Sequence, residues 1–272
     1  MNSLEKKMVD ALLDLKENHH VLGIKAEFEA EGTRLEEALR LKEVVTKAGL
    51  DLTIKIGGCE AVKDMYDART IGVSTIVAPM IETPYAMQKY VQATNFVFPQ
   101  EERESTKFLI NIETKTGFQN LKEITKSPYF KDLSGIVLGR VDMTGSMKLT
   151  RGDVNSEEIF EIAEVMAKEM YANNKEMVIG GGVSAASLPF FKRLPKNSLT
   201  RFETRKVIFD AQQALKDAKA GHGILKAVAF ELMWIKNKYN FYNAISQEDS
   251  KRIEILESRY KDSIREVGGF VE

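Results

Sequence analysis

The chain has 272 residues, of which 43% are hydrophobic and 29% are charged. A chain of this length can bury a sizeable core without disulfides or a structural metal, and it is within the range of a single α/β barrel. Its 39 Lys and Arg residues nearly balance its 40 Asp and Glu residues. The net charge of −1 therefore gives no electrostatic reason to expect a nucleic-acid or membrane partner.

The single cysteine, Cys59, excludes an intramolecular disulfide framework and fits a reducing compartment. It follows two glycines where a helix should begin, and we favour a small packed residue over a nucleophile there. No apolar run approaches the roughly 20 residues of a membrane span. The first 20 residues are typical of an amphipathic helix and lack a signal-peptide cleavage site. We therefore expect a cytoplasmic protein.

Short apolar runs alternate with longer helical patterns along the chain, which is typical of a parallel α/β fold. The predicted strands are residues 21–29, 52–56, 75–80, 108–114, 135–142, 177–182 and 200–209. The predicted helices between them include residues 33–50, 84–96 and 156–174, with Thr33 and Ser156 as N-terminal caps and Gly49 near a C-terminus. About seven strand–helix units come close to the eight of a closed barrel.

No Pro/Gly/Ser-rich linker interrupts this pattern, so the sequence predicts one domain. We expect a (β/α)8 TIM-type barrel with an N-terminal helix over residues 1–220. Residues 221–272 should form extra C-terminal helices that either complete the barrel or are exchanged between subunits.

The predicted strands alternate between apolar and polar residues, whereas strands of an open sheet covered on both faces are nearly continuous apolar runs. In residues 21–29, for example, Ile24 and Phe28 share one face while Lys25 and Glu27 share the other. The apolar face should meet the surrounding helices, and the polar face should line the interior of a barrel. A solvated sheet face is the alternative.

Two carboxylates follow neighbouring strands at the point where each strand should end. Glu113 ends the run FLINIE, and Asp142 ends GIVLGRVD. Such a pair, with positions left for water and substrate, suits a hard divalent cation such as Mg²⁺ or Mn²⁺. A zinc site of His and Cys is not indicated, because the only histidines are His19, His20 and His222. The same two groups could also act as a general acid and base, or as a glycosidase pair.

Five basic residues are predicted around this pair: Lys25, Lys55, Arg140, Arg201 and Arg205. A pocket with a cation and several basic groups suits an anionic substrate such as a 2-oxo acid or a phosphate. The metal could then polarise the ketone while a Lys or Arg stabilises the enolate. Structural salt bridges inside the barrel, such as one between Lys25 and Glu27, are the alternative.

A glycine-rich turn, VIGGGVSAAS at residues 178–187, follows another predicted strand and precedes a helix. Such a turn lets backbone N–H groups approach a phosphate, so Gly181 is a candidate for substrate binding. Close packing at the barrel rim accounts for the glycines equally well.

The run FLINIETKTGFQNLKEI, followed by GIVLGRVDMTGSM, resembles the HpcH/HpaI aldolase/citrate lyase family of the phosphoenolpyruvate/pyruvate superfamily. The resemblance extends over roughly residues 20–190. It implies that Glu113 and Asp142 correspond to the family's two metal-binding carboxylates. TIVAPMIET is similar to the family's strand ending in Pro-Met or Pro-Lys, which places Glu82 in the loop after it.

Two departures from the family pattern concern the substrate. IKIGG, at residues 54–58, takes the place of the strand with the family's pyruvate-binding Arg, but it carries Lys55. Arg140, Arg201 or Arg205 could substitute for that Arg. The family's loop with a proton-managing His is replaced by KAEFEAEG at residues 25–32. Glu27, Glu29 or a metal-bound water would then have to move the proton.

From these patterns we predict a metal-dependent carbon–carbon lyase or aldolase that acts on a 2-oxo acid of the 4-hydroxy-2-oxo type, which could be phosphorylated or CoA-linked. The expected residues fall into three groups: Lys55, Glu27 and Arg140 as catalytic residues; Glu113 and Asp142 as metal ligands; and Lys25, Glu82, Arg201, Arg205 and Gly181 as substrate-binding residues. The alternatives are a citrate-lyase-like acyl-CoA lyase, a Schiff-base aldolase using Lys25 or Lys55, and a non-catalytic barrel that binds a sugar or an acid for regulation.

The C-terminal third predicts self-association. Residues 224–235 are apolar on nearly all sides, and a narrow apolar stripe follows in residues 250–267. The stripe consists of Ile253, Leu256, Tyr260, Ile264 and Val267. We expect a homo-oligomer, and the family resemblance favours exchange of a terminal helix between subunits. A monomeric barrel that buries both segments is the alternative.

Overall fold

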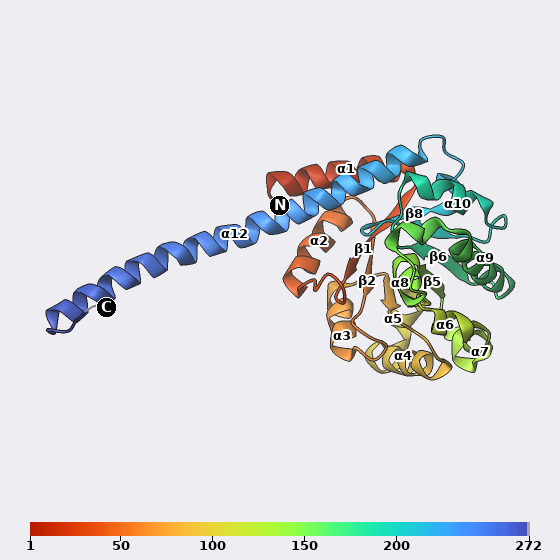
Figure 1. The fold of residues 1–272 in the computed structure, drawn as a ribbon, viewed down its shortest axis with the longest axis horizontal. Coiled ribbons are helices and arrows are strands. Elements are labelled where there is room, and N and C mark those ends of the chain that lie inside the picture. Colours follow the sequence, from red (N-terminus) through yellow and green to blue (C-terminus); the bar gives the residue numbers. More distant parts are fainter. Residues whose placement is uncertain (271–272) are drawn as a thin grey trace. The chain divides into compact units, whose positions relative to one another are not determined.

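The structure is a computed structural model that describes residues 1–270. Eight strands form a closed barrel in chain order, with helices around it (Figure 1). The strands are β1 (Val21–Glu27), β2 (Asp51–Lys55), β3 (Thr75–Ala78), β4 (Lys107–Asn111), β5 (Gly135–Gly139), β6 (Glu176–Gly180), β7 (Arg201–Glu203) and β8 (Val207–Asp210). The predicted barrel of alternating strands and helices is confirmed.

The helices precede or follow the strands, and those within residues 1–231 cover the outside of the barrel. They are α1 (Ser3–His19), α2 (Leu35–Lys47), α3 (Val62–Ile71), α4 (Pro84–Val97), α5 (Gln100–Ser105), α6 (Lys115–Gln119), α7 (Leu121–Lys126), α8 (Arg140–Ser146), α9 (Glu157–Ala172), α10 (Leu188–Arg193), α11 (Ala211–Ala214) and α12 (Ala220–Glu266). Three short 3-10 helices complete this set: η1 (Pro128–Asp132), η2 (Arg151–Asn155) and η3 (Ala185–Ser187). In the described part of the chain, no helix is both long and apolar enough to cross a bilayer.

Local capping explains where several helices begin. The hydroxyl of Ser156 accepts the backbone N–H of Ile159, as the sequence predicted for α9. Thr83 caps α4 in the same way, with Pro84 in the first turn. The prediction for Thr33 was wrong, because Arg34 occupies the cap position of α2. Thr33 instead donates its hydroxyl to Glu31 at 3.3 Å.

The alternation of strand residues separates the outside of the barrel from its inside. Leu52, Ile54, Ile110 and Ile136 are fully buried on the helix-facing side. On the inner side, Val77, Leu109, Val137 and Val178 form one buried apolar cluster. Two positions further along three of these strands, the inner face continues with Asn111, Gly139 and Gly180. The inner face therefore has one apolar layer, and beyond it Asn111 and two glycines lead to the carboxyl ends of the strands.

Two predicted strands differ from the structure. Residues 200–209 were expected as one strand, but they form the antiparallel hairpin of β7 and β8, so β8 also runs antiparallel to β1. The turn contains no glycine or proline that would mark it. Thr204 makes the turn instead: its hydroxyl accepts the N–H of Val207, and its own N–H donates to the carbonyl of Val207. The strand predicted for residues 135–142 ends at Gly139, and α8 begins at Arg140.

The chain divides into two compact units, Met1–Glu231 and Leu232–Glu272. The sequence predicted more than one helix in residues 221–272, but the structure has one continuous helix there, α12, of 47 residues. Within the first unit, Ile224, Ala227 and Phe230 of α12 are buried, whereas Leu225 and Val228 are exposed. The start of α12 therefore buries one face within this unit, and the exchange of a terminal helix between subunits stays a prediction.

Candidate active site at the carboxyl ends of the strands

A cavity of about 250 Å³ opens at the carboxyl ends of the strands. Its walls come from the ends of β1, β2, β4, β5, β6 and β7 and from the loops that follow them. The charged or polar side chains that line it are Lys25, Glu27, Glu29, Lys55, Asn111, Glu113, Asp142, Arg151, Glu203, Thr204 and Arg205. Barrel enzymes assemble their active sites at this end of the strands, so the cavity is the candidate site.

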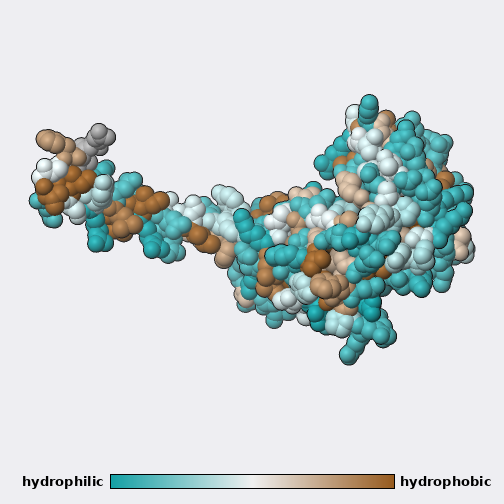
Figure 2. All heavy atoms as spheres, turned by 90° about the horizontal axis from the view of Figure 1, so that it is seen from below, coloured by the Kyte–Doolittle hydropathy of each residue, from teal (hydrophilic) through white to brown (hydrophobic). Residues whose placement is uncertain are grey.

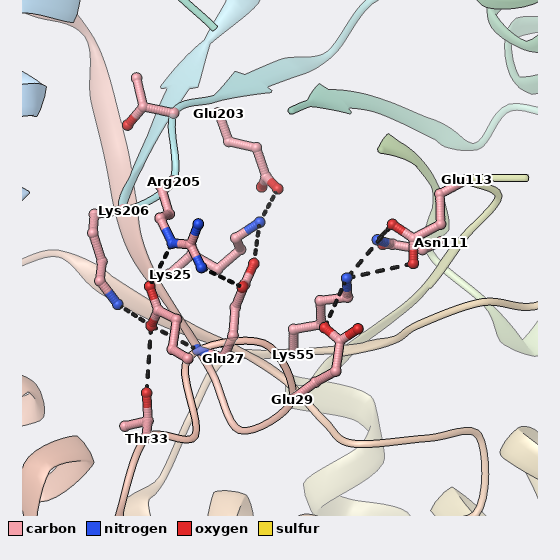
Figure 3. A network of polar contacts seen from close by, with 12 residues as sticks. Lys25, Glu27, Glu29, Thr33, Lys55, Asn111, Glu113, Glu203, Arg205 and Lys206 are labelled. Atoms are coloured by element: carbon pink, nitrogen blue, oxygen red, sulfur yellow. Dashed lines mark hydrogen bonds and ion pairs between the residues drawn. The ribbon is translucent and has the colours of Figure 1, made fainter. Parts of the chain in front are cut away.

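Lys25 joins two carboxylates on one side of the cavity (Figure 3). Its Nζ lies 2.5 Å from Oε1 of Glu203 and 3.2 Å from Oε1 of Glu27. Burial opposes the charge of Lys25, but the two carboxylates outweigh burial and raise its pKa. Burial likewise opposes the charge of Glu27, and Lys25 and Lys55 outweigh it, so the pKa of Glu27 is lowered. This side of the cavity therefore holds charged, mutually paired groups.

Lys55 occupies the corresponding place on the other side (Figure 3). Its Nζ lies 3.0 Å from Oε2 of Glu29 and 3.4 Å from Oε1 of Glu113. Burial opposes its charge, but the negative charge of Glu113 and the contact with Glu29 raise its pKa overall. Lys55 is therefore an ammonium ion that faces the carboxylates of the site.

Glu113 is only 1% exposed and has a defined set of donors. Its Oε1 accepts the backbone N–H of Met80 at 3.0 Å, and its Oε2 accepts Nδ2 of Asn111 at 2.7 Å. Burial raises the pKa of Glu113, and the negative charge of Asp142 adds to the rise. A methyl group at Gly139 would lie 2.3 Å from Oε2 of Glu113, so only glycine leaves room for this carboxylate.

Asp142 lies in the first turn of α8 and lines the same cavity as Glu113. Over residues 1–270, no three or more His, Cys, Asp and Glu side chains come together as metal ligands. Mg²⁺, however, is often held by one or two carboxylates, with water and substrate as its remaining ligands. The cavity lining has five carboxylates against four cationic side chains. Glu113 and Asp142 therefore fit a hard divalent cation with an incomplete protein ligand set.

Glu31 fixes the β7–β8 turn against the loop after β1, and sequence reasoning missed it. Its carboxylate accepts Nε of Arg205 at 3.1 Å and the backbone N–H of Glu27 at 3.3 Å, and it pairs with the buried Lys206. Through these contacts Arg205 reaches the cavity wall, with Nη2 3.9 Å from Oε2 of Glu27. The predicted position of Arg205 at the site thus depends on a hairpin that the sequence did not reveal.

Arg140 is not part of the cavity wall, contrary to the prediction. It is fully buried and donates to the carbonyls of Gly180, Gly181 and Val154. Its remaining partners are the side chains of Asn155 and Ser187, and its guanidinium lies 5.1 Å from the ring centres of Phe190 and Phe191. All of its donors are used within the protein, so Arg140 holds the glycine-rich turn in place and is withdrawn as a catalytic residue.

The same packing explains the glycine-rich turn. Gly181 lines the cavity and has a φ of +78°. A methyl group there would lie 2.7 Å from the backbone nitrogens of Arg140 and Val141. Close packing at the barrel rim and the positive φ therefore account for the glycine at position 181.

Two other predicted substrate-binding residues lie outside the cavity wall. Arg201 is the first residue of β7 and pairs with Glu176, the first residue of β6, so both lie at the opposite, amino end of the strands. Glu82 accepts the hydroxyl of Thr114 at 2.6 Å, and its carbonyl accepts Nδ2 of Asn120 at 2.8 Å. Glu82 thus joins two loops beside the site, and both residues are withdrawn as substrate ligands.

Arg151 lines the cavity and was not expected there. It is exposed at the start of η2, and its side chain forms no hydrogen bond or ion pair with the residues that the structure describes. No periodic pattern in the sequence marks it, because it comes from a loop. Asn111 and Glu203, in contrast, lie on the polar faces of predicted strands and could have been found from the alternation alone.

Comparison with known proteins gives a family match. The sequence model of the HpcH/HpaI aldolase/citrate lyase family matches residues 30–178, which is more than half of the chain. This segment contains Lys55, Glu113 and Asp142. No curated protein matches the sequence.

Solved structures with similar folds share little sequence with this chain. The structure titled citrate synthase SbnG has 12% identity and a TM-score of 0.59, over 86% of this chain and 90% of that one. An HpcH/HpaI aldolase from Desulfitobacterium hafniense DCB-2 has 11% identity and a TM-score of 0.58, over 72% and 81%. A family protein from Burkholderia cenocepacia J2315 has 14% identity and a TM-score of 0.57, over 71% and 89%. At these identities the likeness supports the barrel fold alone.

Proposed function

This chain belongs to the HpcH/HpaI aldolase/citrate lyase family, and from that premise we propose that it is a metal-dependent carbon–carbon lyase acting on a small 4-hydroxy-2-oxo acid. The observation that carries the proposal is the pair Glu113 and Asp142, which line one small cavity next to Lys55. The volume of about 250 Å³ suits a small acid better than a large ligand.

Glu113 and Asp142 would hold Mg²⁺ or Mn²⁺. Asp142 contributes to the raised pKa of Glu113, which indicates that the two negative groups lie close enough to repel each other and that a cation between them would relieve this repulsion. When bound, such an ion acts as a Lewis acid toward the 2-oxo group. Asn111 and the N–H of Met80 keep the carboxylate of Glu113 in position through hydrogen bonds to its two oxygens.

Lys55 would bind the enolate oxygen or the adjacent carboxylate of the substrate. Its ammonium is buried, is charged because of Glu113 and Glu29, and reaches the same cavity. A preorganised positive charge at this point stabilises negative charge as it develops on the substrate. Lys55 therefore takes the place of the family's pyruvate-binding Arg in this proposal.

Glu27 would manage the proton. Its lowered pKa keeps it ionised, so it can accept the proton of the substrate's 4-hydroxyl group. As that proton leaves, the C3–C4 bond breaks and C4 departs as an aldehyde. The bonding pair moves into a C2–C3 double bond, with negative charge on the 2-oxygen. C3 then takes up a proton, and the shortened 2-oxo acid is formed.

Arg151 would receive an anionic group at the rim of the cavity. Two exposed arginines line the cavity, and Arg205 pairs with Glu31, whereas the side chain of Arg151 has no partner among the described residues. The Schiff-base alternative loses support because both candidate lysines are held in the charged form. Carboxylates raise the pKa of both Lys25 and Lys55, and a protonated amine is not a nucleophile.

The test is a set of 4-hydroxy-2-oxo acids of increasing length, with release of aldehyde and 2-oxo acid measured in Mg²⁺ or Mn²⁺ and in excess chelator. We expect cleavage with metal and none in chelator. Full activity in chelator would exclude the metal. Cleavage of CoA thioesters without any cleavage of these acids would exclude the substrate class. Glu82→Gln serves as a control, since it changes a carboxylate beside the cavity but outside its lining.

A further inference from the structure

The C-terminal unit, Leu232–Glu272, carries a regular apolar repeat along α12. We call the residues at alternating spacings of three and four the seam: Leu232, Ile235, Tyr239, Tyr242, Ser246, Asp249, Ile253, Leu256 and Tyr260. This spacing is the 3.5-residue repeat of a coiled coil, sustained over about four heptads. It differs from the wider stripe of a helix that lies on a globular core.

The apolar seam residues are exposed to solvent. Leu232, Ile235, Tyr239, Ile253, Leu256 and Tyr260 have exposed fractions between 51% and 69%. Figure 2 shows apolar surface, in brown, at intervals along this part of the chain. Between residues 232 and 270 the structure describes no secondary-structure element other than α12. The described part of this unit therefore contains nothing else of its own that could cover the seam, and an exposed apolar surface of this extent is typical of an interaction site.

When two copies of the seam run in opposite directions, the aromatic residues of one copy face aliphatic residues of the other. We propose that it pairs with the seam of a second copy of this chain in an antiparallel two-stranded coiled coil, with the two-fold axis between Ser246 and Asp249. Reversal about this axis pairs Tyr242 with the partner's Ile253 and Tyr239 with the partner's Leu256. It pairs Ile235 with the partner's Tyr260. Each large aromatic ring then packs against an aliphatic side chain, which is the favourable alternation of large and small residues across an interface.

The two polar residues in the middle of the seam, Ser246 and Asp249, favour antiparallel over parallel pairing of the helices. In the antiparallel arrangement Ser246 faces the partner's Asp249, and a hydroxyl can donate to a carboxylate. In a parallel, in-register arrangement Asp249 would face the partner's Asp249 inside the seam, which leaves two like charges without compensation. Such a buried charge without a partner costs several kcal/mol.

The charges that flank the seam contribute less. Antiparallel pairing brings Lys236 near the partner's Glu257, which is attractive, and Lys238 near the partner's Arg259, which is repulsive. Parallel pairing would instead bring Lys236 near the partner's Glu231 and Arg252 near the partner's Glu257. Exposed pairs of this kind contribute about 0.2–1 kcal/mol each. The cost of placing two Asp249 side chains opposite each other is therefore larger than the contributions of the flanking charged pairs. This favours the antiparallel pair, which is a symmetric closed dimer.

The first experiment measures the mass of the full-length protein by sedimentation at micromolar concentration, with Leu256→Lys as the test and Ile255→Lys as its matched control. Both residues are exposed and aliphatic, but only Leu256 belongs to the seam. We expect Leu256→Lys to weaken the dimer by about a hundredfold or more, while Ile255→Lys leaves it unchanged. A monomeric wild-type chain, or equal effects of both substitutions, would overturn the proposal.

The second experiment determines the direction. Lys236→Glu and Glu257→Lys should each weaken the dimer by about fivefold, and the double variant should restore it, because the exchanged charges meet across the antiparallel pair. In a parallel pair the double variant sets the new carboxylate at position 236 against the partner's Glu231. It also sets the new ammonium at position 257 against the partner's Arg252, so it would be the weakest of the three. Lys251→Glu, on the face away from the seam, is the control. Restored dimer in the double variant supports the antiparallel pair, and additive loss contradicts it.

Discussion

The ammonium nitrogen of Lys55 lies 3.4 Å from Oε1 and 3.5 Å from Oε2 of Glu113, so one cation faces both oxygens of a carboxylate that is 1% exposed. A divalent ion at Glu113 would compete with Lys55 for these oxygens. Once the ion binds, the ammonium would become available to the substrate. The two residues therefore allow separate tests of metal binding and of substrate stabilisation.

Glu113→Gln and Asp142→Asn should each abolish divalent-ion binding while the barrel remains folded. The amide keeps the size of each side chain but removes the charge that a hard cation requires. Titration calorimetry with Mn²⁺ measures the binding without reference to any substrate, and the melting temperature reports the fold. Mn²⁺ binding at wild-type affinity in either variant would exclude that residue as a ligand.

Lys55→Ala should lower kcat by about a hundredfold or more, in the range found for removal of one oxyanion-type donor. The variant should bind the divalent ion at least as tightly as the wild type, because the competing ammonium is gone. Lys55→Arg should keep part of the activity, since the family carries Arg at this place. If Lys55→Arg were as inactive as Lys55→Ala, a Schiff base would become the better explanation.

Metal affinity should depend on pH through Glu113. Burial and the charge of Asp142 raise the pKa of this carboxyl group above its ordinary value of 4.5. A raised folded-state pKa means that the ion-free protein is stabilised by protonation of Glu113, and this stabilisation is lost as the pH rises through that pKa. Metal binding needs the ionised form, so affinity should fall on acidification before pH 4.5 is reached. A constant Mn²⁺ affinity down to that pH would contradict the raised pKa.

Gly139→Ala should displace Glu113 and impair metal binding, because the new methyl group would lie 2.3 Å from Oε2 of Glu113. Overpacking of this kind costs about 1–3 kcal/mol of unfolding free energy. Gly145→Ala is the matched control in α8, where a methyl group meets nothing within 4 Å. That control should keep metal binding and gain about 0.5–1 kcal/mol in stability, as alanine does in a helix. Equal behaviour of the two variants in chemical denaturation and Mn²⁺ titration would refute the steric argument.

Arg151→Gln should raise KM about tenfold or more with little change in kcat, since a rim cation that binds the distant anionic group acts equally on substrate and transition state. Lys192→Gln is the control, because Lys192 is an exposed cation on α10 outside the cavity wall. Steady-state kinetics separate the two constants. A fall in kcat at constant KM would instead place Arg151 at the reacting atoms.

The polar alternation of the strands was sufficient to predict which residues point into the barrel. A side chain's face follows from whether its position is odd or even, so the sequence alone assigns Lys25, Glu27, Lys55 and Glu113 to one interior. The motifs around Glu113 and Asp142 likewise predicted the family. Both inferences use local patterns, which the sequence carries directly.

Only the tertiary structure decided the position of each residue along the barrel axis and the residue at which each strand ends. Arg201 and Glu203 share a face, yet Arg201 lies at the amino end of β7 and Glu203 at the cavity, because position along the axis depends on strand register. Arg140 was expected on a strand, but β5 ends one residue before it and the side chain is enclosed by Phe190 and Phe191. The alternation of apolar and polar residues predicts which face of a strand a side chain occupies, but it predicts neither the length of the strand nor its neighbours. Register, turns such as the one at Thr204, and loop residues such as Arg151 therefore depend on contacts between distant parts of the chain.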